Sequence, residues 1–498
     1  MIISLKHVLT LCLAGLLLPG ANTATTASAA DAARRPNILL ITADDLGCLL
    51  SCYGEKRMAT PQLDALAASG VRFANAYVAE SSCSQSRASL LTGRWPHQCG
   101  QVGLAQLGFT MHPGQQTLPA LLKTAGYRTG IIGKLHVMPT AAFPFDWMPA
   151  KERMNTFPTR NVRWVAGQSR EFFASAKAAD KPFFYYVNFL DPHVPLTRET
   201  DQIAGLPEKP FIVVDIEEPL PMGAPPEVGN HLATARLLNA VLRVDAGMGL
   251  LLEELKAAGF ADNTIVIFVG DNGTAMPRGK TWSYETGVRV PMLVRWPGVA
   301  KPGQIRSENV SLVDVMPTLL AATGIKAPDH LAGAALQPLL RGEPAKDWRE
   351  FLFTEENFHE PQMFHGQRTV RDGRYKLLLN LVTFQPHSEM RSDPVTREWW
   401  VDVGLPAPGQ SPVELFDLQT DPDETKNLAD DPAYAATRRR LESALQHLRE
   451  EEKADPLLDP ARVQRWKDAA ARWGKLPQVI SGPNKVVHIP EGELELLK

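Results

Sequence analysis

The sequence has few of the features that mark nucleic-acid-binding, nucleotide-binding or disulfide-stabilised proteins. Only five cysteines occur in 498 residues, which excludes a scaffold held together by many disulfides. The formal net charge is −3, so no general excess of positive charge favours a nucleic acid partner or an acidic membrane. Neither a Walker loop nor a GxGxxG fingerprint is present. An anionic substrate would therefore need a local cationic pocket.

Long apolar runs are also scarce. The run at residues 8–18 is shorter than the roughly 20 residues that a membrane-spanning helix needs. It follows Lys6 and precedes an Ala-Ser-Ala site at residues 27–29, an order that is typical of a signal peptide. We therefore predict that residues 1–29 are cleaved during export to the periplasm or the medium. The mature protein is then expected to have no membrane span.

Apolar runs and helical segments alternate through the first two thirds of the chain. Hydrophobic residues make up 44% of the sequence, which is enough for a large core. Short runs typical of buried parallel strands lie at residues 37–42, 71–79, 128–137, 183–189 and 263–269. Segments with helical spacing separate them. This alternation predicts an α/β fold with a mainly parallel, doubly wound sheet.

The pattern changes near residue 345. Strand-like segments FLFTEEN, RTVRDGRYKLLLNL and VELFDL are joined by turns, and a charged helix follows at about residues 433–454. These features predict a small antiparallel sheet with a packed helix. We therefore divide the mature chain into a catalytic domain, residues 30–344, and a C-terminal α+β subdomain, residues 345–498. In the latter, Trp399 and Trp400 either offer a flat face for a sugar ring or pack in the core.

Acidic and amide side chains follow two of the predicted strands. Asp44 and Asp45 come directly after the run at 37–42, and Asp271 and Asn272 come after the run at 263–269. In open α/β sheets, ligands bind at the carboxyl ends of the strands. Adjacent carboxylates repel each other unless a cation joins them, and oxygen ligands favour a hard divalent ion. The alternative for Asp44 and Asp45 alone is an ordinary acidic turn.

A cysteine stands at the start of a predicted helix in the segment SSCSQSRASLLTGR, residues 81–94. Gly93 is a helix stop, and Arg87 can lie beside Cys83 one helical turn later. Backbone N–H groups at a helix start favour an anion and lower the pKa of a cysteine. The pattern therefore indicates a nucleophile, and the alternative is a buried, inert cysteine. Cys48 and Cys52 either bridge or remain free.

Three further basic residues follow predicted strands. Lys134 and His136 end the run at 128–137, and an extended backbone would point both to the same side. A lysine for an oxyanion and a histidine for proton transfer would suit such a place. His193 follows the run at 183–189 in the triplet Asp-Pro-His. The alternative for all three is a structural role or an exposed strand end.

The sequence around Cys83 resembles the signature of the type I sulfatases. Cys-Ser-Gln-Ser-Arg is followed by Ala-Ser-Leu-Leu-Thr-Gly-Arg, and DDLG, GIIGKLHV, DPHVP and GDNG occur in the family's order. The likeness extends from Pro36 to about Pro432. Gln85 stands where the usual signature has proline. Segments such as GIIGKLHVMPTAAFPFDW and DNGTAMPRGK resemble the heparan N-sulfatase, or sulfamidase, branch. The resemblance implies an alkaline-phosphatase-like fold.

The resemblance also implies roles for individual residues. Cys83 would be oxidised by a maturation enzyme to formylglycine, whose hydrate is the nucleophile. One Ca²⁺ would be bound by Asp44, Asp45, Asp271 and Asn272 together with residue 83. Arg87 would steady the nucleophile, Lys134 and Lys280 would hold sulfate oxygens, and His136 and His193 would act as base and acid.

The substrate implied by the resemblance is a sulfated saccharide, with N-sulfoglucosamine of heparan or heparin favoured. Alternatives are an O-sulfate ester on another glycan, a phosphomonoester or phosphonate, and a non-catalytic role in binding sulfated glycans. We expect substrate contacts from loops that carry His97, Glu355, His359 and Arg368.

Overall fold

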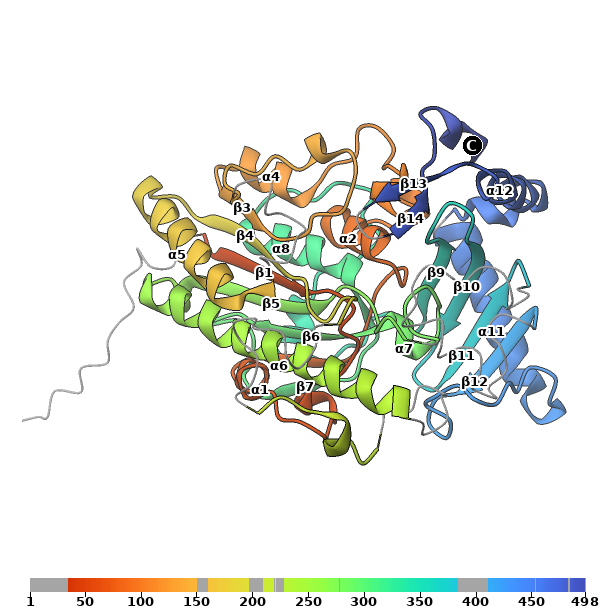
Figure 1. Ribbon diagram of the computed structural model, residues 1–498, viewed down its shortest axis with the longest axis horizontal. Helices are drawn as coiled ribbons and strands as arrows, with labels where there is room; N and C mark the ends of the chain where they lie inside the picture. Colours follow the sequence, from red (N-terminus) through yellow and green to blue (C-terminus); the bar gives the residue numbers. More distant parts are fainter. Residues whose placement is uncertain are drawn as a thin grey trace, which may run out of the picture. The chain divides into compact units, whose positions relative to one another are not determined.

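The computed structural model describes residues 35–149, 160–196, 209–218, 220, 228–276, 278–383, 411–452, 454–481 and 484–497 (Figure 1). Pro36–Lys498 forms one compact unit. The predicted signal peptide and the pair Trp399 and Trp400 lie outside the described residues. No helix in the described ranges has the length and apolar character needed to cross a membrane.

Eight described strands form the larger sheet. They are β1 (Asn37–Ala43), β2 (Val71–Tyr77), β3 (Arg128–Ile132), β4 (Phe183–Phe189), β5 (Thr264–Gly270), β6 (Arg289–Arg295), β7 (Gln304–Arg306) and β8 (Val310–Ser311). The order is β3-β4-β1-β5-β6-β2-β7, with β8 also paired to β2. Strands β3, β4, β1 and β5 are parallel, whereas β6 runs antiparallel to β5 and β2. The five predicted runs therefore form five of these strands.

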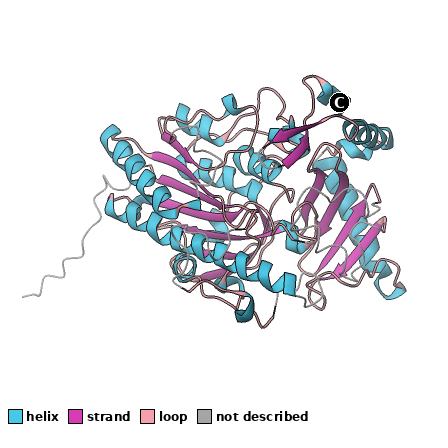
Figure 2. Cartoon of the chain, in the orientation of Figure 1, coloured by secondary structure: helices cyan, strands magenta, loops and turns pink. Residues whose placement is uncertain are grey.

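Helices cover both faces of this sheet, as Figure 2 shows. The main ones are α1 (Pro61–Ala68), α2 (Cys83–Thr92), α4 (Leu118–Thr124), α5 (Val162–Ala179), α6 (Val228–Ala257) and α8 (Val315–Thr323). Short helices α3 (Pro96–Cys99), α7 (Glu285–Val288) and α9 (Gln337–Leu340) lie in the connections. The doubly wound arrangement that the alternating sequence predicted is confirmed.

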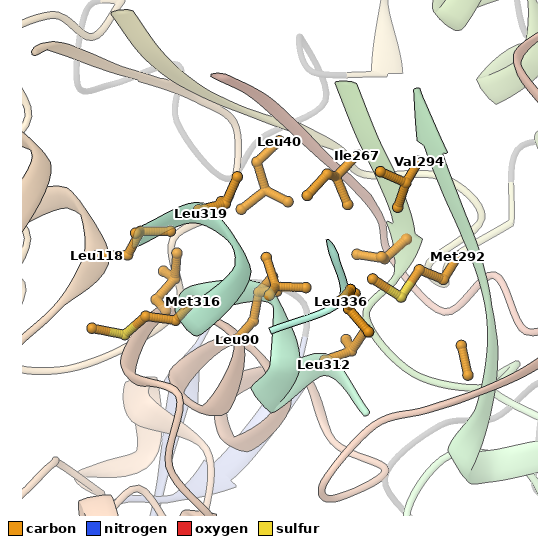
Figure 3. Packing of buried hydrophobic residues seen from close by; sticks show 14 of the residues in the cluster. Leu40, Leu90, Leu118, Ile267, Met292, Val294, Leu312, Met316, Leu319 and Leu336 are labelled. Carbon is orange, nitrogen blue, oxygen red and sulfur yellow. The ribbon is translucent and has the colours of Figure 1, made fainter. Parts of the chain in front are cut away.

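The alternation of side chains along β1 shows why both faces need helices. Leu40 packs in a core with residues of α2, α4 and α8, and Figure 3 shows it near Leu90 and Leu319. Its neighbours Leu39 and Ile41 belong to a second core, with residues of α1, α5 and α6. Because successive residues of a strand point to opposite faces, a strand that is apolar throughout must be covered on both sides.

Helix α1 is capped by a residue that is distant in the sequence. The residue before the helix, Thr60, has a hydroxyl that typically caps helices, but its side chain accepts from no backbone N–H of α1. Instead, the Asp245 carboxylate on α6 accepts from the backbone N–H groups of Leu63, at 2.9 Å, and Gln62, at 3.3 Å. Carboxylates at a helix N-terminus satisfy N–H groups that have no partner within the helix. Asp245 therefore joins α6 to α1.

The C-terminal part contains the predicted antiparallel sheet. Its order is β12 (Val413–Asp417), β11 (Tyr375–Asn380), β10 (Phe364–Arg371) and β9 (Leu352–Phe358). Leu441 and Leu445 of α11 (Ala435–His447) pack against it. Helix α12 (Pro460–Trp473) and the hairpin β13 (Gln478–Ser481) and β14 (Asn484–Val487) add elements that the sequence analysis did not anticipate.

Two local expectations are wrong. Glu355 lies within β9 and Arg368 within β10, not in loops. Strand β3 ends at Ile132, so Lys134 and His136 lie in the loop beyond it, and His136 has a positive φ of 53°. An extended backbone therefore does not place these two side chains. Gly133, with a φ of 86°, turns the chain where a Cβ would lie 2.2 Å from the carbonyl oxygen of Asn188.

Candidate active site

Three carboxylates meet at the carboxyl ends of the neighbouring strands β1 and β5. Asp44, Asp45 and Asp271 are each at most 1% exposed. The backbone N–H of Asp45 donates to Asp271 Oδ1 at 3.0 Å, and Asn272 Nδ2 donates to Asp45 Oδ1 at 2.7 Å. Since β1 and β5 pair in parallel, their ends lie side by side and bring together residues that are more than 220 positions apart.

Cys83 is the first residue of α2, and its Sγ lies 3.3 Å from Asp44 Oδ1 and 3.9 Å from Asp45 Oδ1. Every residue of α2 is buried. Burial, together with the Asp44 carboxylate, raises the pKa of the Cys83 thiol to about 12. The lower pKa predicted from the helix start is therefore wrong for the unmodified cysteine. Its thiol is poorly suited to act as a nucleophile near neutral pH.

Arg87 is the central cation of the site and is wholly buried. It donates from Nε to Asp271 Oδ2 at 2.9 Å, and its Nη2 lies 3.6 Å from Asp44 Oδ2. Its Nη1 donates to the carbonyl oxygen of Lys134 at 2.8 Å and to Asn188 Oδ1. The guanidinium thus joins the ends of β1, β5, β4 and the loop after β3. Asn188 was missed in the sequence because it lies inside an apolar strand.

Two lysines complete the ring of charges. Lys134 Nζ lies 2.7 Å from Asp44 Oδ2, and Lys280 Nζ lies 2.8 Å from Asp45 Oδ1. Both lysine side chains reach solvent at the edge of the site, with 11% of Lys134 and 10% of Lys280 exposed. Although burial opposes it, Lys134 and His193 hold the pKa of Asp44 well below its usual value. The lysines can therefore meet an anion that approaches from solvent.

The donor set fits a divalent cation. Asp44, Asp45, Cys83 and His193 each present a ligand atom, and these atoms lie within 4.8 Å of one another. The Asn272 Oδ1 atom is buried without a hydrogen-bond partner in the described structure. Burial and the Asp44 carboxylate raise the pKa of Asp271 to about 7, which shows that the carboxylates repel one another. A hard cation would relieve both the repulsion and the orphaned oxygen.

His193 reaches this group from the loop after β4. Its Nε2 lies 3.9 Å from Asp45 Oδ2. Its Nδ1 contacts the carbonyl oxygen of Val194, and because a carbonyl oxygen only accepts, Nδ1 carries the hydrogen of the neutral ring. Burial lowers the pKa of His193 to about 4. The ring therefore presents an unprotonated Nε2 to the site.

A buried ion cluster holds the His193 loop. The Asp191 carboxylate accepts from Arg160 Nη1 and Arg243 Nε, and Arg160 Nη2 donates to the carbonyl oxygen of His193 at 2.6 Å. All three charged residues are at most 2% exposed. The sequence pointed to Asp191 only as a neighbour of His193. Its arginine partners come from before α5 and from α6, and no local pattern marks them.

His97, Glu355 and Arg368 meet, but away from any open surface. His97 Nδ1 lies 2.5 Å from Glu355 Oε2, and Arg368 Nη2 lies 3.7 Å from the same atom. Glu355 and Arg368 are 0% exposed, and Arg368 is also paired with Asp455 at 2.9 Å. Their role as substrate contacts stays a prediction, and this geometry favours support of the chain around the site.

His359 lies closer to the Cys83 turn. Its Nδ1 lies 2.9 Å from Ser82 Oγ. Burial, followed by the charges of Lys280, His365, Lys134 and His193, holds the pKa of His359 well below its usual value. The electrostatic neighbours of this predicted substrate contact thus include Lys134, Lys280 and His193 of the site.

The Cys83 turn also rests on the C-terminal sheet. The backbone N–H of Ser81 donates to Glu356 Oε2 at 3.0 Å. Gln85 Nε2 donates to Glu80 Oε1 at 3.0 Å and to the carbonyl oxygen of Phe358. Gln85 is 0% exposed. The residue that departs from the usual signature is therefore part of the contact between α2 and β9.

Two family models match the chain. The one described as Sulfatase matches residues 36–325, and the one described as N-sulphoglucosamine sulphohydrolase, C-terminal, matches residues 278–394. The first match spans more than half of the sequence. The chain therefore belongs to the sulfatase family.

Individual relatives agree with this assignment. N-sulphoglucosamine sulphohydrolase of Homo sapiens is 35% identical over 450 residues, which cover 81% of this chain and 88% of the relative. A solved structure described as a complex with its substrate D-glucosamine-2-N,6-O-disulfate has a TM-score of 0.63 at 21% identity and covers 85% of this chain and 99% of that chain. A phosphonate monoester hydrolase from Silicibacter pomeroyi has a TM-score of 0.64 at 22% identity and covers 84% and 96%. At these identities the two structures show the fold alone.

These comparisons confirm the predicted fold class, the sulfatase family and the likeness to the sulfamidase branch. The chain is an enzyme, a sulfatase that hydrolyses sulfate esters or sulfamates. The buried carboxylates, Arg87, the two lysines and His193 form one site at the carboxyl ends of the strands.

Proposed function

We propose that this sulfatase removes the N-linked sulfate group from glucosamine residues of heparan sulfate or heparin, after export from the cell. The observation that carries the proposal is the 35% identity to human N-sulphoglucosamine sulphohydrolase over 81% of the chain. The match of residues 278–394 to the C-terminal family model of that enzyme supports the same choice. Export is supported by the signal-peptide pattern at residues 1–29.

The charges of the site suit a sulfate group. The ammonium groups of Lys134 and Lys280 lie at the exposed side of the carboxylates and are placed to bind sulfate oxygens. Arg87 holds Asp271 and Asp44 beneath residue 83. Negative charge that develops on the sulfate group during transfer would therefore be met by fixed cations.

Proton transfer is assigned to the two histidines. His193 would act as the acid toward the departing nitrogen, because its Nε2 borders the site, 3.9 Å from Asp45 Oδ2. Its neutral ring would first have to take up a proton at Nε2, which the Asp45 carboxylate favours. His136 would take a proton from the hydroxyl of the modified residue 83. The Arg160–Asp191–Arg243 cluster keeps the His193 loop in place during this exchange.

Two groups would complete this site. Conversion of Cys83 to formylglycine would supply a hydrated aldehyde, whose hydroxyl attacks sulfur and can later expel sulfate, and the high pKa of the unmodified thiol gives a reason for such a conversion. One Ca²⁺ would be held by residue 83 together with Asp44, Asp45, Asp271 and Asn272. The ion would make that hydroxyl a stronger nucleophile and would neutralise the negative charge of the sulfate oxygens.

A second candidate is an O-sulfate ester of the same or another sugar. The structure solved with D-glucosamine-2-N,6-O-disulfate shares the fold over 85% of this chain. The fold is also shared with a phosphonate monoester hydrolase, so phosphonates and phosphomonoesters belong in the same test.

The experiment is a substrate panel on protein from an exporting host, with the peptide that carries Cys83 analysed by mass spectrometry. The panel contains N-sulfoglucosamine, glucosamine 6-sulfate, the disulfated sugar, an aryl sulfate and phenyl phosphonate. We expect sulfate release to be fastest from N-sulfoglucosamine, and the peptide mass to match an aldehyde. Faster hydrolysis of glucosamine 6-sulfate would support the second candidate. Full sulfatase activity in protein whose Cys83 peptide has the unmodified mass would refute the formylglycine mechanism.

A further inference from the structure

The two ring nitrogens of His136 have different surroundings. Nε2 contacts Oε1 of Gln106, an exposed residue in the short 3₁₀ helix Ala105–Leu107. Nδ1 is buried and has no hydrogen-bond partner in the described structure. One side of the ring thus meets a side chain at the surface, and the other side faces inward without a partner.

The contact with Gln106 determines where the hydrogen of the ring lies. A carboxamide oxygen accepts hydrogen bonds and cannot donate, so the contact requires a hydrogen on Nε2 of His136. Burial, followed by the charge of Lys134, holds the pKa of His136 well below its usual value, so the ring is neutral. A neutral imidazole carries one hydrogen. Nδ1 therefore keeps its lone pair.

His136 lies within electrostatic reach of the active site. The charged groups that act on His136 are Lys134, Asp44, Arg87 and Lys280, all of which surround residue 83. Lys134 is two residues away in the same loop, and its carbonyl oxygen accepts from Arg87. A buried, unprotonated ring nitrogen near these charges is what a general base requires.

We propose that Gln106 is a positioning residue that fixes His136 as the Nε2–H tautomer and thereby leaves Nδ1 as the proton acceptor of the sulfatase reaction. The tautomer follows from the Gln106 contact and the neutral state of the ring, whereas the use of Nδ1 as the base rests on the proposed function. Without the acceptor at Nε2, the hydrogen can move to Nδ1, where it blocks the base. Gln106 thus acts through His136.

The chain offers a matched set of variants. Gln106→Leu removes the acceptor at similar size, and Gln106→Glu keeps an oxygen acceptor at the same place. Gln116 is another exposed glutamine, so Gln116→Leu controls for the change in surface character. His136→Gln identifies the signals of His136 among the 12 histidines of the sequence.

The test is a long-range ¹H–¹⁵N correlation spectrum of protein labelled with [¹⁵N]histidine, which needs no turnover. In the wild type and in Gln116→Leu, we expect a pyrrole-like Nε2 and a pyridine-like Nδ1 for His136. Gln106→Leu should shift both signals toward a mixture of tautomers, and Gln106→Glu should restore the wild-type pattern. In parallel, kcat for an aryl sulfate should fall roughly tenfold to a hundredfold in Gln106→Leu, less than the roughly 10²–10⁴-fold effect of removing a general base, because part of the ring keeps the active tautomer. KM should change less than about twofold.

A hydrogen on Nδ1 in the wild type would overturn the proposal, and so would an unchanged tautomer in Gln106→Leu. If Gln106→Leu shifts the tautomer as expected but keeps the wild-type kcat, the proposal that Nδ1 of His136 is the general base is refuted. If the tautomer behaves as expected but N-sulfoglucosamine is not hydrolysed, the positioning role stands and the proposed substrate is wrong.

Discussion

Replacing Gln85 by leucine removes a buried amide while nearly preserving its volume. The amide donates to Glu80 Oε1 at 3.0 Å and to the carbonyl oxygen of Phe358. A buried acceptor that loses its donor costs about 1–3 kcal/mol. Glu80 keeps two hydrogen bonds from Asn357, at 2.9 and 2.7 Å, so the loss there is partial. We therefore expect Gln85→Leu to lower the free energy of unfolding by about 2 kcal/mol.

Urea unfolding measures this change. The surface variant Gln116→Leu should change the free energy of unfolding by less than about 0.5 kcal/mol. Gln85→Pro, which restores the usual signature, should cost at least as much as leucine. Proline is tolerated by the backbone in the first turn of α2, but it lacks the amide and leaves unfilled volume. A loss below about 0.5 kcal/mol in Gln85→Leu would refute the reasoning that this amide supports the Cys83 turn.

Four further changes have defined outcomes. Cys83→Ala should abolish sulfate release while the circular dichroism spectrum stays unchanged, and retained turnover would contradict the nucleophile assignment. Asp271→Asn should weaken Ca²⁺ binding by calorimetry and lower activity together, while a chelator should inactivate the wild type; activity without metal would count against the calcium site. Arg243→Lys should reduce kcat more for N-sulfoglucosamine than for an activated aryl sulfate, because a good leaving group has less need of the acid His193; equal losses would point to a merely structural role. Asp245→Ala should lower the free energy of unfolding by about 1–2 kcal/mol through the lost cap of α1, with kcat unchanged, and an unaltered unfolding curve would contradict that contact.

The sequence predicted the parts of the site that follow buried strands. Runs such as residues 37–42 are apolar throughout, so a carboxylate that ends one of them is conspicuous, and parallel pairing brings these ends together. Asp44, Asp45, Asp271 and Asn272 were found in this way. The helix at Cys83 was also predicted with its stop at Gly93, which the structure places in the left-handed region with a φ of 64°.

The sequence did not reveal partners that only tertiary packing brings together. Arg368 was named only as a substrate contact, and nothing in the sequence pointed to its partner Asp455, which lies 87 positions away. The alternation of residues along a strand does not predict that charged side chains such as Glu355 and Arg368 are buried. Their charges are tolerated in the interior because they pair with each other, and because Glu355 also pairs with His97. The same holds for His136, whose place depends on a turn at Gly133 against β4 and not on strand alternation.

The complete burial of α2 sets an order of events in the life of the chain. Cys83 is 1% exposed, and all ten residues of its helix are covered. If Cys83 is converted to formylglycine as proposed, the modifying enzyme has to reach a side chain that the folded chain covers. On that proposal, the conversion would take place before α2 is buried. The fraction of active protein would then depend on the rate of modification relative to the rate of folding. Slower folding of the chain should therefore raise the yield of active enzyme.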